Sequence, residues 1–193
     1  LGFSQHIHSV KTFTEKPNIH PILPFAGDVI FEGRFGNSIR LGNTSKTGGK
    51  NNNWSDVGQN GSPITIIKNG QPISGSSQGY VPEVENINND LTSVYLTSTQ
   101  KIPIEVATST TVAGQASTVP FSTITSPPVP SPKSYSNPQI ILSSGRLLFN
   151  STSDSIILSS HKSIVAESML DAGLKSQTKN VNIIAEKGVV RLG

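Results

Sequence analysis

The sequence predicts an all-β protein that combines a small barrel with a repetitive stalk, and three observations support this fold class. Short apolar runs alternate with polar residues along the 193-residue chain, a period of two that is typical of strands. Only 14% of the residues are charged, while Ser, Thr, Asn and Gly are abundant, which favours strands and turns over helices. The last third of the chain repeats every eight residues, which indicates one strand-and-turn unit stacked many times.

The N-terminal part is predicted to contain an arm and a barrel. Residues 1–21 are polar and are expected to form an extended arm. Residues 22–107 hold about five or six predicted strands, the size of an OB-like β-barrel. The first two strands are expected on either side of a turn or bulge at Gly33 and Gly36. Their apolar positions are Val29, Phe31, Phe35, Ile39 and Leu41.

Three further apolar runs complete the predicted barrel. The run that begins at Pro63 is followed by Asn69-Gly70, a dipeptide typical of type I′ turns, and predicts a hairpin. Residues 86–96 could open with a helical turn capped by Asn88 or Asp90, but Thr92, Val94 and Tyr95 favour a strand. Residues 102–106 alternate and are predicted to form another strand.

The C-terminal part is predicted to be a linker and a stalk. Residues 108–137 are rich in Ser, Thr and Pro with few apolar anchors, which indicates a linker. Residues 138–193 carry the octads, and such a short unit must stack on copies of itself or on other chains. The oligomerisation core of the stalk is predicted at Ile140, Leu142, Leu148, Ile156, Leu158, Ile164 and Ala166.

The octad phase slips after Ala166, and two pairs of residues could resume it, Val181 with Val189 or Ile184 with Leu192. The sequence starts at Leu1 rather than Met and stops at Gly193 within the pattern. We therefore expect a processed or longer product, with a stalk that continues beyond Gly193.

Composition argues against several classes of function. The net charge of +3 comes from 15 Lys and Arg against 12 Asp and Glu, with no basic run interleaved with aromatic residues, so nucleic-acid binding is not expected. The chain has no cysteine and therefore no disulfides or thiolate metal sites. No stretch approaches the roughly 20 apolar residues of a membrane-spanning helix.

Motifs for catalysis are weak, and no enzyme activity is expected. A phosphate-binding loop would need Ser or Thr after Lys50, where the chain has Asn51. A glycosidase needs two positioned acids, but the twelve acids are scattered, and neither the Glu83/Glu85 pair beside Pro82 nor Glu32 or Asp56 is marked for catalysis. The nucleophile-elbow pattern of hydrolases is missing as well.

Metal binding also has little support. His6 and His8 would project to one side of a strand, but a zinc site needs three or four ligands, and only His20 and His161 remain. A trimer could supply three ligands as three copies of one histidine around its axis, so metal binding stays an alternative. The expected result is no metal and no cofactor.

Several segments resemble one protein family. They are Phe31–Gly42, Asn53-Trp-Ser, Gly61–Gly70, Asn86–Leu96 and Gln100–Ile104. With the order of barrel, linker and octad stalk, these segments resemble the baseplate hub or central-spike (cell-puncturing) proteins of contractile-tailed bacteriophages. The resemblance covers most of residues 22–193. Its barrel motif is carried by Phe31, Gly33, Arg34, Gly36, Ile39 and Trp54.

The resemblance implies a structural protein of the virion, located in the tail baseplate, that pierces the host envelope during injection. It implies an OB fold at the tail-tube end and an intertwined, trimeric β-helical needle beyond it. The implied partners are two further copies of the chain, the tail tube, other hub proteins and a spike-tip protein, with transient contact to the host envelope.

Two departures from that family pattern stand out. Some relatives carry a lysozyme domain between barrel and needle, whereas here residues 108–137 occupy that place and are too few for such a domain. The octads also lack the strict Val-x-Gly rhythm of the best-known needles.

Two other functions are open. A trimeric receptor-binding tail fibre or adhesin would need an exposed groove lined by aromatic side chains, to which Trp54, Tyr80 and Tyr95 could contribute. A peptidoglycan hydrolase would need paired acids in a cleft, and the scattered acids argue against it.

Overall fold

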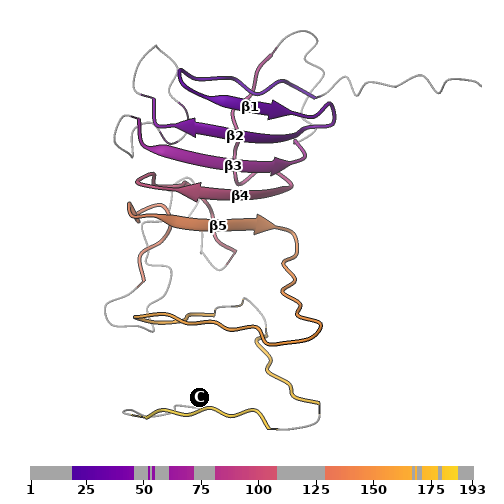
Figure 1. The fold of residues 1–193 in the computed structure, drawn as a ribbon, viewed down its shortest axis with the longest axis vertical. Helices are drawn as coiled ribbons and strands as arrows, with labels where there is room; N and C mark the ends of the chain where they lie inside the picture. Colours follow the sequence, from indigo (N-terminus) through magenta and orange to yellow (C-terminus); the bar gives the residue numbers. More distant parts are fainter. Residues whose placement is uncertain are drawn as a thin grey trace, which may run out of the picture.

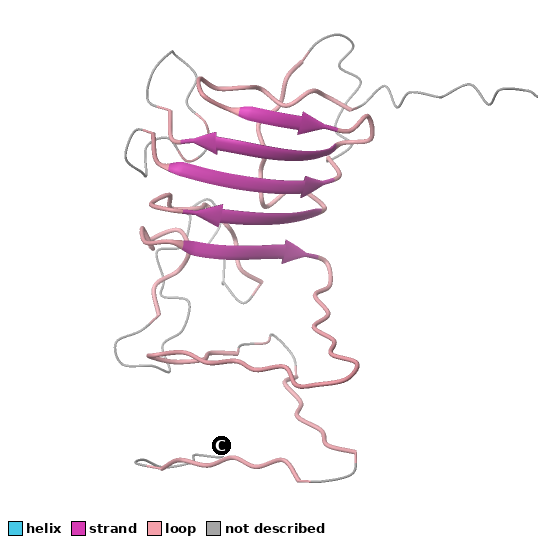
Figure 2. Ribbon diagram, in the orientation of Figure 1, coloured by secondary structure: helices cyan, strands magenta, loops and turns pink. Residues whose placement is uncertain are grey.

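The structure is a computed structural model of residues 1–193, and it describes residues 19–45, 52, 54, 61–71, 81–107, 129–166, 168, 171–177 and 180–186. The described part is all-β, as predicted, and five strands form one antiparallel sheet (Figures 1 and 2). The strands are β1 (Val29–Glu32), β2 (Asn37–Asn43), β3 (Pro63–Asn69), β4 (Thr92–Thr97) and β5 (Gln139–Ser144). Within the described ranges, no helix is long and apolar enough to cross a membrane.

Each strand pairs with its neighbours in chain order, so that β1 and β5 are the two edges of the sheet. The predicted turn between the first two strands is confirmed, and Gly36 in that turn has a φ of 87°, a conformation that side chains disfavour. The segment around Val94 is confirmed as a strand. β5 begins inside the segment that was predicted to be stalk, and it extends the sheet by pairing with β4.

Two predictions about local structure were wrong. No hairpin forms at Asn69-Gly70, because β2 and β4 occupy both edges of β3. Residues 102–106 lie outside the strands: Pro103 has no N–H to donate, and Asn88 binds both the Pro103 carbonyl and the Glu105 N–H at 2.8 Å. Ile102 instead buries its side chain in the core, where it is 1% exposed.

The hydrophobic core lies on one face of the sheet. Side chains of β3, β4 and β5 meet residues of the loops that cross this face. The buried cluster consists of Trp54, Ile64, Ile66, Ile87, Tyr95, Ile102 and Ile141, with Val84 and Ile104 packed against it. These loops therefore close one side of the sheet with residues of the same chain.

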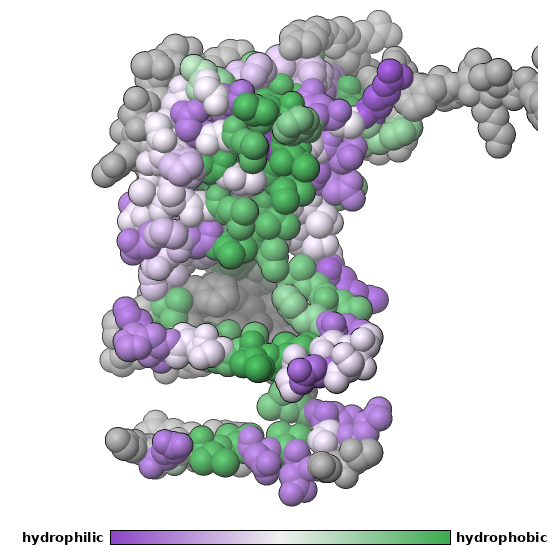
Figure 3. Space-filling model, in the orientation of Figure 1, coloured by the Kyte–Doolittle hydropathy of each residue, from purple (hydrophilic) through white to green (hydrophobic). Residues whose placement is uncertain are grey.

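The opposite face of the sheet is apolar and exposed. Successive residues of a strand point to opposite faces, and here the outward positions are mostly Val, Ile, Leu and Phe. Figure 3 shows hydrophobic side chains gathered in a band that crosses the strands. The exposed members are Val29, Phe31, Ile39, Leu41, Ile67, Leu96, Ile140 and Leu142.

Candidate functional site

The segments after β5 are extended, and the described residues between 145 and 186 belong to no strand or bridge. Figure 1 shows them crossing back and forth beyond β5. Their large apolar side chains are exposed, up to 83% at Ile157. These side chains are Leu147, Leu148, Phe149, Ile156, Ile157, Leu158, Ile164, Leu174, Val181, Ile183 and Ile184.

The seven predicted stalk positions do not form a core within one chain. Ile140 and Leu142 lie on β5 and point to the exposed face of the sheet. The other five are exposed in the extended segments, and they are Leu148, Ile156, Leu158, Ile164 and Ala166. Extended backbone outside any strand ladder, with exposed apolar side chains, is suited to pairing with another chain.

The six residues of the predicted barrel motif fall in three different places. Phe31 and Ile39 are cross-strand neighbours on the exposed face of the sheet. Gly33, Arg34 and Gly36 belong to the turn between β1 and β2.

Trp54, the sixth residue of the motif, is 1% exposed and lies in the core on the opposite face of the sheet. Its indole Nε1 donates a hydrogen bond to the Asn43 carbonyl at 3.2 Å. The structure therefore does not bring the six motif residues together in one site.

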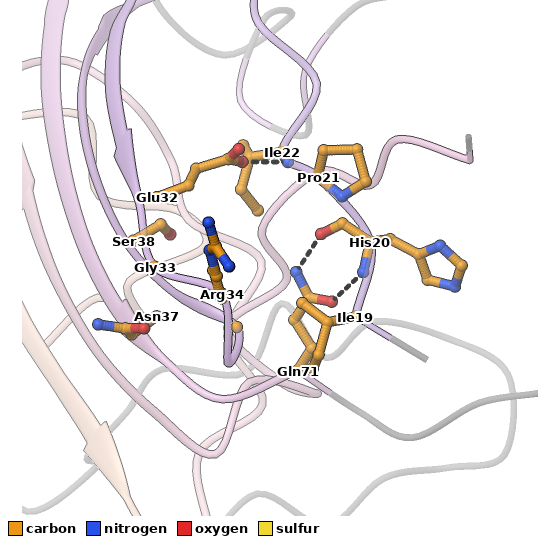
Figure 4. A pocket seen from close by; sticks show the side chains of 11 residues that line it. Ile19, His20, Pro21, Ile22, Glu32, Gly33, Arg34, Asn37, Ser38 and Gln71 are labelled. Atoms are coloured by element: carbon orange, nitrogen blue, oxygen red, sulfur yellow. Dashed lines mark hydrogen bonds between the residues drawn. The ribbon is translucent and has the colours of Figure 1, made fainter. Parts of the chain in front are cut away.

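A cavity of about 330 Å³ lies beside the β1–β2 turn. Figure 4 shows Arg34 between Ser38 and the segment that carries His20. The Gln71 side chain binds the His20 backbone twice, accepting at 2.9 Å and donating at 2.6 Å, and Glu32 accepts from the Ile22 N–H. These hydrogen bonds hold the incoming chain against the turn.

Arg40 is the centre of a buried ion cluster on the core face of β2, where it is 0% exposed. Its Nε and Nη2 donate to the two carboxylate oxygens of Glu85, both at 2.8 Å, and Nη1 pairs with Asp28. Nη2 also donates to the Leu23 carbonyl at 2.9 Å, and the guanidinium lies 5.9 Å from the Trp54 ring centroid. The cluster ties three separate segments to the sheet.

A second buried pair joins Lys68 of β3 to Asp90, with 3.7 Å between Nζ and Oδ1 and both side chains 2% exposed. Burial raises the pKa of Asp90 to about 6, against the opposing effect of the Lys68 charge. Burial also raises the pKa of Tyr95 above its ordinary value. An acid with a raised pKa is a candidate catalyst, but the Asp90 side chain is only 2% exposed and is paired with Lys68.

Two of the other acids considered as catalysts are held in structural contacts. Glu85 is bound by Arg40, and Glu32 accepts from Ile22, while Asp56 lies outside the described residues. In the described part of the chain, no group of three or more His, Asp or Glu side chains could hold a metal ion. His20 is buried and His161 is exposed, whereas His6 and His8 lie outside the described residues.

Two of the three aromatic side chains proposed for an adhesin groove are buried. Trp54 is 1% exposed and Tyr95 is 2% exposed, so that neither can stack on a glycan at the surface. Tyr80 lies outside the described residues. The groove expected for a receptor-binding protein therefore does not form from Trp54 and Tyr95.

Sequence reasoning missed the buried ion pairs, although strand parity carried a signal for one of them. Lys68 has the same parity as Ile64 and Ile66, so alternation alone places its ammonium on the core face. Arg40 gave no such signal, because the apolar residues of β2 have the opposite parity and lie on the exposed face.

Comparisons with protein-family models, with curated proteins and with solved structures found no match to this chain. The surfaces described above are therefore the basis for inferring function. In the described residues, the conspicuous features are exposed apolar surface and extended segments that belong to no strand.

Proposed function

We propose that the chain is a structural protein of a virion, a central-spike or hub component of a contractile phage tail that pierces the host envelope. Three copies would build one spike, with the sheet and the N-terminal arm toward the tail tube and the segments after β5 toward the tip. The observation that carries this proposal lies in the extended segments after β5, where the described residues between 145 and 186 belong to no strand and expose eleven large apolar side chains.

The physical argument begins with the backbone. An extended segment that pairs with no other strand makes fewer hydrogen bonds within the protein than a strand in a sheet does. Eleven large apolar side chains in these segments are also exposed to water. Pairing with the same segments of other copies satisfies both demands at once, since each copy supplies strands and apolar side chains. A trimer of this kind closes its own edges and leaves none open for further growth.

Three finer features belong to the same proposal. The octads would wind with those of two other copies into an intertwined β-helix, and their apolar positions would face the axis. The OB-like barrel stays a prediction, since β1 and β5 are the two edges of the described sheet. The role is mechanical, so the proposal includes no catalytic site, metal or cofactor.

The mass of the full-length protein in solution tests the proposal. Light scattering should give three times the chain mass of 20.4 kDa. A variant with Leu148→Ser, Ile156→Ser and Ile164→Ser should lose the trimer, because each change removes an apolar side chain from the shaft. A control with Ser151→Thr and Ser159→Thr, in the same exposed segments, should keep it.

A monomeric wild-type protein would overturn the proposal. A trimer that the three serine changes leave intact would also contradict it, because assembly would then not depend on the segments after β5. Saturable binding of the trimer to a host glycan would instead favour the receptor-binding fibre.

A further inference from the structure

The exposed face of the sheet carries two apolar rows that cross all five strands in register. One row runs through Phe31, Ile39, Ile67, Val94 and Leu142, each paired with the next across the ladder. The other runs through Val29, Leu41, Thr65, Leu96 and Ile140. Nine of these ten positions are apolar, and none is charged.

This face is too large and too apolar to be left in water. Eight of the ten side chains are between 40% and 71% exposed. Together they present on the order of 700 Å² of apolar surface, above the roughly 300–600 Å² of the largest patch on a typical monomer. That area is close to the ~800 Å² per partner of a standard protein interface.

The chain itself already covers the other face. Ile64, Ile66 and Tyr95 point to the core side, where the loops of the same chain bury them to 2% exposure or less. Strands that are apolar on both sides are typical of sheets buried on both faces. The sequence of β3, with apolar residues at both parities, therefore indicates a second partner for the sheet.

The two rows continue into the stalk. Ile140 and Leu142 end the rows at β5, and they are also the first members of the octad series that proceeds through Leu148 and Ile156. Figure 3 shows hydrophobic surface on the sheet and again on the segments beyond β5. The apolar face of the sheet and the predicted core of the stalk thus belong to one series of positions.

We propose that the exposed face of β1–β5 is covered by the same face of other copies of this chain, so that the subunit interface begins at β1 and not in the stalk. The partner is a further copy because the two rows contain no charge that would repel the same face of another copy, and in a cyclic trimer the same face of each copy can be turned toward the threefold axis. This inference rests on the proposed trimer and extends its interface to the sheet.

Cysteine labelling tests the inference, since the natural chain contains no cysteine. Ile67→Cys places one thiol on the face, and Asn89→Cys places a control thiol at an exposed loop residue. In the native full-length protein, a maleimide should react with the thiol at position 67 at least about tenfold more slowly than with the control. In urea, the two rates should become equal.

The mass of each labelled protein in solution distinguishes the sheet interface from the proposed function. An oligomer with fast labelling at position 67 would overturn the sheet interface and leave the proposed function standing. A monomer would overturn both, and slow labelling in a monomer would mean that the chain covers its own face.

A pair of charge variants provides an independent readout. Ile39→Asp with Ile67→Asp places two charges on cross-strand neighbours in the first row and should dissociate the oligomer. Asn37→Asp with Asn69→Asp adds the same charges to the next cross-strand pair, at the polar edge of the same face, and should leave the mass unchanged. Equal masses for the two variants would contradict the inference, and labelling at position 67 decides the case if the first variant does not fold.

Discussion

Arg40 and Glu85 are separated by 45 residues in the sequence and form a bidentate ion pair in the interior, with two N–O distances of 2.8 Å. Asp28 neutralises the remaining side of the guanidinium. An ion pair that water does not reach adds little net stability, but removing one partner leaves an uncompensated buried charge. The buried ion pair therefore holds residues 22–28 and 81–90 against β2.

Replacement of Arg40 should show how much the buried ion pair contributes to stability. Arg40→Met leaves Glu85 and Asp28 buried without a counter-charge, and it should lower the free energy of unfolding by about 3–5 kcal/mol. Arg146→Met is the matched control at an exposed position, with an expected change within about 0.5 kcal/mol. Urea denaturation measures the unfolding free energy of both variants. Equal midpoints would show that the buried ion pair does not hold the fold together.

Asp90 should make stability depend on pH near neutrality. Burial raises its pKa from 3.8 to about 6, so the folded state binds the proton more tightly than the unfolded state does. Stability therefore rises as the pH falls through 6, by about 1 kcal/mol between pH 7 and pH 5. Urea midpoints at several pH values measure this gain.

Replacing the Asp90 carboxyl group by an amide, which does not titrate, separates this effect from the titration of other groups. Asp90→Asn should lose the gain between pH 7 and pH 5, while Asp154→Asn, at an exposed position, should keep it. An unchanged pH profile in the Asp90 variant would show that another group is responsible.

Gly36 should resist substitution because its φ is 87°, where a Cβ is strained, and because a Cβ there would lie 3.2 Å from Ile19 Cδ1. Gly36→Ala is expected to cost about 1–2 kcal/mol of unfolding free energy. Gly145→Ala meets no atom within 4 Å and should be neutral or slightly stabilising. Thermal unfolding of the two variants compares them, and a lower midpoint for Gly145→Ala would contradict this account.

Two adjacent isoleucines of β3 should behave differently. Ile66 is 0% exposed and Ile67 is 43% exposed, on opposite faces of the sheet. Ile66→Ala opens a cavity and should cost about 2–5 kcal/mol at any protein concentration. Ile67→Ala should lower stability mainly at low concentration, because it weakens assembly. Unfolding curves at two protein concentrations distinguish the two effects.

Local patterns predicted the strands better than they predicted which face of each strand is buried. The turn at Gly36 and the strand around Val94 followed from glycine placement and β-branched residues. The alternation of Phe31, Ile39 and Leu41 predicted two strands of a barrel without showing which face is covered, and in the structure these residues line the exposed face. Periodicity identifies the two faces of a strand, but what covers each face depends on tertiary contacts.

The errors at Asn69-Gly70 and at residues 102–106 have the same origin. Asn69-Gly70 favours a tight turn, but long-range pairing to β4 is what completes the ladder of β3. Residues 102–106 alternate as a strand does, yet Asn88 holds their backbone and Ile102 fills the core. Neither contact can be inferred from the spacing of apolar residues along the chain.

The direction of the strands has a mechanical consequence. Figure 1 shows that the strands lie across the long axis of the molecule, and the hydrogen bonds of an antiparallel ladder run perpendicular to the strands. A push along the axis therefore presses each strand onto its neighbour, whereas a pull would open the ladders one after another from the edge at β5. A sheet oriented in this way resists compression along the axis better than tension.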